Sequence, residues 1–124
     1  MCKKIEQFVD NWIKYNEIAE DVPWRDDYWP YIFEVIDWAF SNHAERLWQF
    51  ILAVYRRKPS QKVIGNLAAG PLEDLLGKFG HKFIERVIAL ARSDKDFKFL
   101  LGGVWQNDMP EEIWQMIQAV RNEL

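Results

Sequence analysis

The chain has little of the chemistry that most enzymes and secreted proteins use. Its 124 residues include one cysteine, Cys2, two histidines, three serines and no threonine. A single cysteine cannot form an internal disulfide, which favours a reducing, cytoplasmic compartment. No glycine is followed by Lys-Ser or Lys-Thr, as a phosphate-binding loop requires, and no serine lies in a nucleophile-elbow pattern. We therefore expect a protein that is not an enzyme.

Long apolar runs and an excess of basic residues are also missing. The N-terminus, MCKKIEQFVDNW, lacks the apolar core of a signal peptide, and no run approaches the length of a membrane span. The net charge is −3, with −1 in residues 1–62 and −2 in residues 63–124. Since neither half is basic, we expect a soluble protein whose main partner is neither nucleic acid nor membrane.

Apolar residues recur instead at spacings of three and four, which indicates amphipathic helices. Half of the residues are apolar and 15% are aromatic, enough for a core in one domain, residues 1–124. No segment alternates as a strand, and no hairpin signal occurs. We expect an all-α bundle of seven or eight short helices, with stacked helical hairpins, as in HEAT repeats, as one arrangement of the C-terminal half.

Glycine, proline and capping residues predict where these helices begin and end. Asn42 with Glu45 fits a capping box, and Ser93 with Asp96 fits another cap. Gly70 is expected to take the left-handed position that ends a helix, so Gly70→Val would destabilise the fold. A break is expected at Gly80. The wide apolar surface of residues 24–41 predicts the central helix.

Three segments carry a resemblance to a known family: Ala68–Leu76 (AAGPLEDLL), Phe83–Val87 (FIERV) and Leu101–Asn107 (LGGVWQN). Together they resemble a family of small bacterial domains of unknown function over roughly residues 45–120. The resemblance implies an all-helical fold of bacterial or phage origin and supplies no catalytic residues. Small helical proteins of this type are similar in fold and size to immunity proteins, which bind and block a toxin encoded beside them.

Sites for a metal, a cofactor or acid–base chemistry are weakly indicated. His81 has Glu85 four residues on, but a zinc site normally needs about four ligands. The acidic pairs Glu73-Asp74 and Glu111-Glu112 are explained by the dipole at helix starts. We therefore predict no catalytic residues, no metal and no cofactor.

The seven tryptophans are the remaining unusual feature. Four of them, Trp12, Trp38, Trp48 and Trp114, lie at or beside apolar stripes, and their expected role is core packing. Trp105 follows a helix end and is expected to fix a corner. Trp24 and Trp29 instead lie among charges, a setting typical of protein-binding hot spots, although Trp24 could also staple its loop to the core. The predicted partner-binding residues are Glu17, Glu20, Asp21, Trp24, Asp26, Asp27, Tyr28 and Trp29.

Two functions remain open, and a third is less favoured. The first is an immunity protein or inhibitor whose acidic segment covers a basic toxin or effector. The second is an adaptor or scaffold module in which residues 60–120 form a concave face lined by Trp105, Gln106 and Asn107. The third is a small enzyme or ligand-binding domain with a pocket at His81 or the paired carboxylates.

Overall fold

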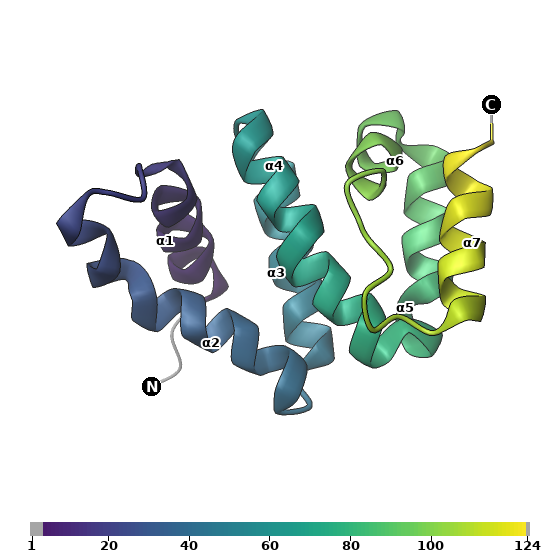
Figure 1. Ribbon diagram of the computed structural model, residues 1–124, viewed down its shortest axis with the longest axis horizontal. Helices are drawn as coiled ribbons and strands as arrows, with labels where there is room; N and C mark the ends of the chain where they lie inside the picture. The colour runs from purple at the N-terminus through teal and green to yellow at the C-terminus, as the bar shows by residue number, and fades with distance from the viewer. Residues whose placement is uncertain (1–3, 124) are drawn as a thin grey trace.

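The computed structural model describes residues 4–123, so Cys2 lies outside the described residues. No strand occurs within residues 4–123, and the predicted all-α fold is confirmed. The elements are α1 (Ile5–Glu17), the 3-10 segment η1 (Pro23–Tyr28), α2 (Trp29–Phe40), α3 (Ala44–Arg56), α4 (Gln61–Leu67), the π segment η2 (Ala68–Leu72), α5 (Glu73–Ser93), α6 (Lys95–Leu101) and α7 (Glu111–Arg121). In Figure 1, α1 and α2 form one end, α5 to α7 form the other, and α3 and α4 lie between them.

The central helix is α3, because both ends of the molecule pack on it. Its Phe50 meets Trp12 of α1 and Trp38 of α2 edge-to-face, with ring centroids 5.8 and 5.7 Å apart. Its Trp48 meets Phe97 of α6 at 6.3 Å. The three tryptophans are buried, as predicted, while Trp114 is half-buried. The expectation that residues 24–41 form the central helix is wrong, since only one face of α2 is covered.

The junction between α4 and α5 differs from the predicted break at Gly70. No glycine within residues 4–123 has a positive φ, and η2 joins the two helices directly. Pro71 is buried inside η2. Proline has no N–H and its ring collides with the carbonyl four residues back, and a widened π turn relieves that collision. Because Gly70 does not have a positive φ, valine there would not be strained in the way that was expected. A Cβ at Gly70 would also meet nothing within 4 Å.

Two of the predicted caps are also wrong. Asn42 has a φ of 63° and makes no cap; the residue before α3 is His43, and Glu45 instead pairs with Arg86 at 2.7 Å. At the start of α6 the cap is Asp94 and not Ser93. The Asp94 Oδ1 accepts hydrogen bonds from the backbone N–H groups of residues 96 and 97, at 3.0 and 3.2 Å. Both errors place the helix start one residue too early.

α5 and α7 run side by side in the same direction. In the first half of each helix, a Cβ built on Gly80 of α5 would lie 3.1 Å from Ile113 of α7. At the C-terminal ends, Arg92 forms an ion pair with Glu123 at 2.8 Å. The predicted break near Gly80 is present as a kink, because Phe79 has non-helical angles (φ −132°, ψ 28°) within α5. Gly80 also lets α7 approach closely, since it presents no side chain to Ile113.

The parallel arrangement requires residues 102–110 to return along the molecule, and Figure 1 shows this return loop beside α5. A buried carboxylate holds it: Glu73 Oε1 accepts hydrogen bonds from the Trp105 N–H at 3.1 Å and from Asn107 Nδ2 at 2.7 Å. The Trp105 ring is 71% exposed, so its backbone and not its side chain fixes this corner. The acidic side chain of Glu73 therefore serves more than the helix dipole.

Candidate protein-binding surface

The structure brings the predicted partner-binding residues together at one end of the molecule, where α1 passes through a turn and η1 into α2 (Figure 1). We call residues 17–29 the acid–aromatic segment. η1 has no buried residue, and Trp24 and Trp29 are 55% and 45% exposed. Tyr28 is half-buried, and the five carboxylates of the segment are exposed. The idea that Trp24 staples its loop to the core is therefore wrong.

Arg25 does hold the segment in place. Its guanidinium lies 3.8 Å from the centroid of the Tyr15 ring, and its Nε donates a hydrogen bond to the Tyr15 carbonyl at 3.1 Å. The Trp29 ring also contacts Tyr15, and the centroids of the two rings are 6.2 Å apart. Cation–π contact and hydrogen bonding together reduce the freedom of the turn, so Trp24 projects from a backbone that is already ordered.

The sequence reasoning missed an exposed apolar row along α2. Trp29, Phe33, Ile36 and Phe40 are spaced by four, three and four residues and are 45%, 58%, 39% and 65% exposed. At a rise of 1.5 Å per residue the row is roughly 16 Å long. The opposite face of α2 is buried through Ile32, Val35, Trp38 and Ala39. A helix at the end of a bundle buries only one face. An apolar surface wider than one face would therefore have predicted that part of α2 is exposed.

Unpaired carboxylates surround the α2 apolar row. Residues 17–40 contain seven acidic residues and one basic residue, a net charge of −6 against −3 for the whole chain. The seven acidic side chains are exposed, and none of them forms an ion pair or hydrogen bond with another residue of the described chain. They are Glu17, Glu20, Asp21, Asp26, Asp27, Glu34 and Asp37. We call this surface, residues 17–40, the acidic face.

A hollow of about 370 Å³ lies on the acidic face, lined by Pro30, Phe33, Glu34 and Asp37. Two of these residues offer apolar surface and two offer carboxylates. This combination suits a lysine or arginine side chain, whose carbon stem packs on apolar atoms while its charged head meets carboxylate oxygens. The hollow therefore has the chemistry of a site for one basic side chain.

Outside the acidic face, His81, Glu73 and Asp74 have partners within the fold. His81 Nε2 lies 3.0 Å from Glu112 Oε1, and both side chains are exposed. Burial raises the pKa of Glu73, opposed by its two hydrogen bonds, and burial likewise raises the pKa of Asp74, opposed by Lys78. Within residues 4–123 no group of three or more His, Cys, Asp or Glu side chains is arranged to hold a metal ion.

The fold and this surface define a small all-α protein with an exposed acidic and apolar face at one end. The chain belongs to the family of unknown function DUF6869, whose sequence model matches residues 19–124. The match includes nearly all of the acidic face and extends well beyond the expected residues 45–120. No curated protein and no solved structure matches the chain. Across the described residues, no helix is sufficiently long and apolar to cross a membrane.

Proposed function

We propose that this protein is a non-catalytic, protein-binding domain that acts as an immunity protein or inhibitor, and that its acidic face covers a basic surface of a toxin or effector. The observation that carries the proposal is the set of seven unpaired carboxylates around an exposed apolar row. Surface carboxylates are usually dispersed among basic residues, which keeps local potentials small. Here their charge is concentrated and the apolar side chains within it are uncovered.

The two components of the acidic face would contribute differently to binding. Concentrated charge of one sign steers an oppositely charged partner and raises the association rate. Uncovered tryptophan and phenylalanine rings supply the apolar contact that dominates binding energy at interface centres. Trp24 and Phe33 are the proposed anchors, since both are more than half exposed and lie beside carboxylates. The hollow at Glu34 and Asp37 would receive one basic side chain of the partner.

The second candidate function, an adaptor or scaffold module, is favoured by a groove between α4 and α6 at residues 61–122. This groove falls within the predicted concave region, but Trp105, Gln106 and Asn107 do not line it. Asn107 instead holds the return loop through Glu73, and Gln106 bonds Glu111 at 2.8 Å. An adaptor would use this groove in addition to the acidic face, whereas an inhibitor needs the acidic face alone.

The proposal is tested by co-expressing the chain with the product of the gene adjacent to its own. We expect the two proteins to co-purify as a stoichiometric complex and the neighbour's toxicity to be suppressed. Asp26→Lys together with Asp27→Lys should weaken the complex by at least about tenfold, mainly through slower association, and reduce its salt dependence. Circular dichroism and the melting temperature should be unchanged, because both side chains are exposed and unpaired.

The matched control reverses two exposed acidic residues outside the acidic face, Glu85→Lys with Asp108→Lys, and so produces the same change in net charge. This control should bind and suppress toxicity as the wild type does. Equal loss of binding in both double variants would mean that only net charge matters and that the acidic face is not the site. A complete absence of complex and of suppression would reject the inhibitor function.

A further inference from the structure

A second surface, opposite in charge to the acidic face, lies between α4 and α6. One hollow of about 690 Å³ lies between α4 and η2 on one side and α6 with the end of α7 on the other. A second hollow of about 450 Å³ adjoins it and extends to the end of α3. Gln61, Ile64 and Phe99 line both hollows, so the two form one continuous groove. We call it the α4–α6 groove.

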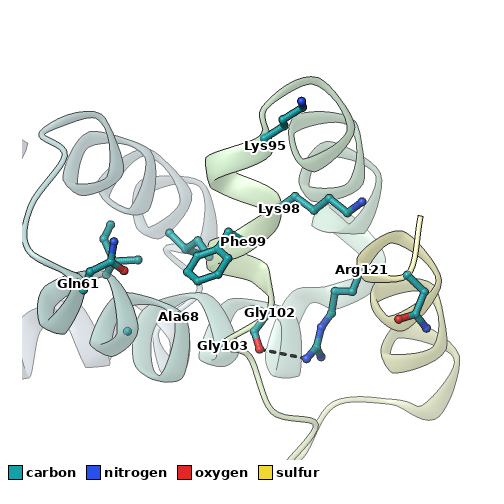
Figure 2. A pocket seen from close by; sticks show the side chains of 12 residues that line it. Gln61, Ala68, Lys95, Lys98, Phe99, Gly102, Gly103 and Arg121 are labelled. Atoms are coloured by element: carbon teal, nitrogen blue, oxygen red, sulfur yellow. Dashed lines mark hydrogen bonds between the residues drawn. The ribbon is translucent and has the colours of Figure 1, made fainter. Parts of the chain in front are cut away.

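Part of the groove lining is apolar. Phe99 is 75% exposed, and in Figure 2 its ring points from α6 toward the side of the groove where Gln61 lies. The half-buried Ile64 continues the apolar surface on the opposite side, and the buried Ala68 also lines the hollow. A Cβ added at Gly65 would meet nothing within 4 Å, so the space above this helical glycine is empty. An uncovered phenylalanine beside empty space is the usual composition of a docking groove.

The charge of the larger hollow is positive. Lys95, Lys98 and Arg121 line it, and among residues 4–123 no carboxylate side chain does. Two of these cations are oriented by the backbone: Arg121 donates a hydrogen bond to the Gly102 carbonyl at 3.0 Å (Figure 2), and Lys98 donates one to the Glu123 carbonyl. The carbonyl orients Arg121 without neutralising its charge, whereas Lys98 also lies within the electrostatic influence of the Glu123 carboxylate. The smaller hollow is balanced, with Arg56 and Lys58 facing Asp94 and Asp96.

We propose that the α4–α6 groove binds an acidic polypeptide segment of a partner protein, anchored by one large apolar side chain. The anchor would pack between Phe99 and Ile64 above Gly65, and carboxylates of the segment would lie along Lys95, Lys98 and Arg121. Two joined hollows suit a length of chain better than a compact small molecule. This inference concerns a different surface from the acidic face, and its outcome is independent of the proposed inhibitor function.

The experiment measures binding of acidic peptides to the full chain. The probes are amidated twelve-residue peptides with one tryptophan, leucine or phenylalanine among aspartates and glutamates, followed by fluorescence polarisation. We expect dissociation constants in the micromolar range, weakened as salt increases. Peptides with the apolar anchor changed to alanine, or with the acids changed to their amides, should bind at least about tenfold more weakly.

Variants of the groove separate docking from general attraction. Gly65→Leu fills the groove without a steric clash and should abolish binding, whereas Gly77→Leu, at another helical glycine with open space, should not. Lys95→Glu with Lys98→Glu should weaken binding by at least about tenfold, unlike Lys4→Glu with Lys82→Glu, which changes the net charge equally. Both leucine variants should fold at least as stably as the wild type, because leucine favours helix over glycine.

Four results would overturn the proposal. The first is no peptide binding below about 1 mM. The second is binding that Gly65→Leu leaves unchanged. The third is displacement of the peptide by inorganic phosphate at a concentration that supplies the same total negative charge as the peptide. That result would make the groove a small-anion site. The fourth is self-association in sedimentation equilibrium that Gly65→Leu removes, which would identify a second copy of this chain as the occupant.

Discussion

At the scale of single residues, burial and approach distance decide roles that residue type leaves open. Glu73 and Glu111 both lie in the first turn of a helix, but their burial differs. Glu73 is buried and holds the return loop with one carboxylate oxygen. Gly77 and Gly80 are three residues apart in α5, yet only Gly80 faces another helix. The two glycines offer a matched test.

Replacing Glu73 with glutamine should change how stability depends on pH. The pKa of Glu73 is raised by burial, so its carboxyl keeps a proton that the unfolded chain has already lost. Stability from this group therefore falls as pH rises from its unfolded pKa of about 4.5 through the folded pKa. Glutamine keeps both accepted hydrogen bonds and does not titrate. Urea unfolding at pH 4, 5.5 and 7 should show Glu73→Gln gaining on the wild type as pH rises.

Glu85→Gln is the control for that measurement, because Glu85 is exposed. Its stability relative to the wild type should hardly vary over the same pH range. If the difference between Glu73→Gln and the wild type stayed constant, or moved the other way, Glu73 would be ionised in the fold throughout.

Leucine at the two glycines of α5 should have opposite effects. At Gly80 it would push against Ile113 and separate α5 from α7, which should lower the free energy of unfolding by about 1–3 kcal/mol. At Gly77 the space is open, and the gain in helix propensity should raise it by about 0.5–1 kcal/mol. Chemical denaturation measures both. A tolerated leucine at position 80 would show that the two helices do not pack closely there.

At the scale of elements, a side chain caps the start of α4 and of α6, whereas neighbouring elements decide which face of a helix is exposed. The start of α6 depends on Asp94, whose carboxylate accepts two backbone N–H bonds. A hydrogen bond from the Tyr55 hydroxyl is the main cause of the lowered pKa of Asp94. The stabilisation that accompanies this lowered pKa is present above the unfolded pKa of Asp94 and is lost as pH falls through the folded value.

Removing this cap should be costly for so short a helix. Asp94→Ala is expected to lower the free energy of unfolding by about 1–2 kcal/mol, since two N–H groups and the Tyr55 hydroxyl lose their partner. Asp96→Ala removes an exposed acid from the same turn that makes no side-chain bond, and should change stability by less than about 0.5 kcal/mol. Thermal unfolding at pH 7 compares them; equal effects would contradict the capping role.

At the scale of the whole molecule, the aromatic residues of the core differ from those proposed to bind a partner. Phe50 is fully buried and touches two tryptophans, whereas Phe99 is 75% exposed beside the α4–α6 groove. The two proposed binding surfaces differ in charge: residues 17–40 have a net charge of −6, whereas Lys95, Lys98 and Arg121 line the larger hollow of the α4–α6 groove.

Alanine at the two phenylalanines should demonstrate this separation. Phe50→Ala is expected to lower the free energy of unfolding by about 3–5 kcal/mol, because it opens a cavity between α1, α2 and α3. Phe99→Ala should change stability by less than about 0.5 kcal/mol while weakening peptide binding in the groove. Urea denaturation and fluorescence polarisation give the two values. A large loss of stability at Phe99 would place that ring in the core.

The sequence by itself determined the helical class, the approximate helix positions and the acid–aromatic segment. These follow from local causes, namely apolar spacing and the clustering of charge along a few residues. Trp12, Trp38 and Trp48 were assignable to the core for the same reason.

Only the tertiary structure decided which helix is central, which face of α2 is left uncovered, and that α4 and α6 border a cationic groove. It also replaced the expected break at Gly70 with a π turn around Pro71. Each of these depends on contacts between residues far apart in sequence. An apolar row has the same periodicity whether or not a neighbouring helix covers it, so periodicity alone cannot distinguish core from binding surface.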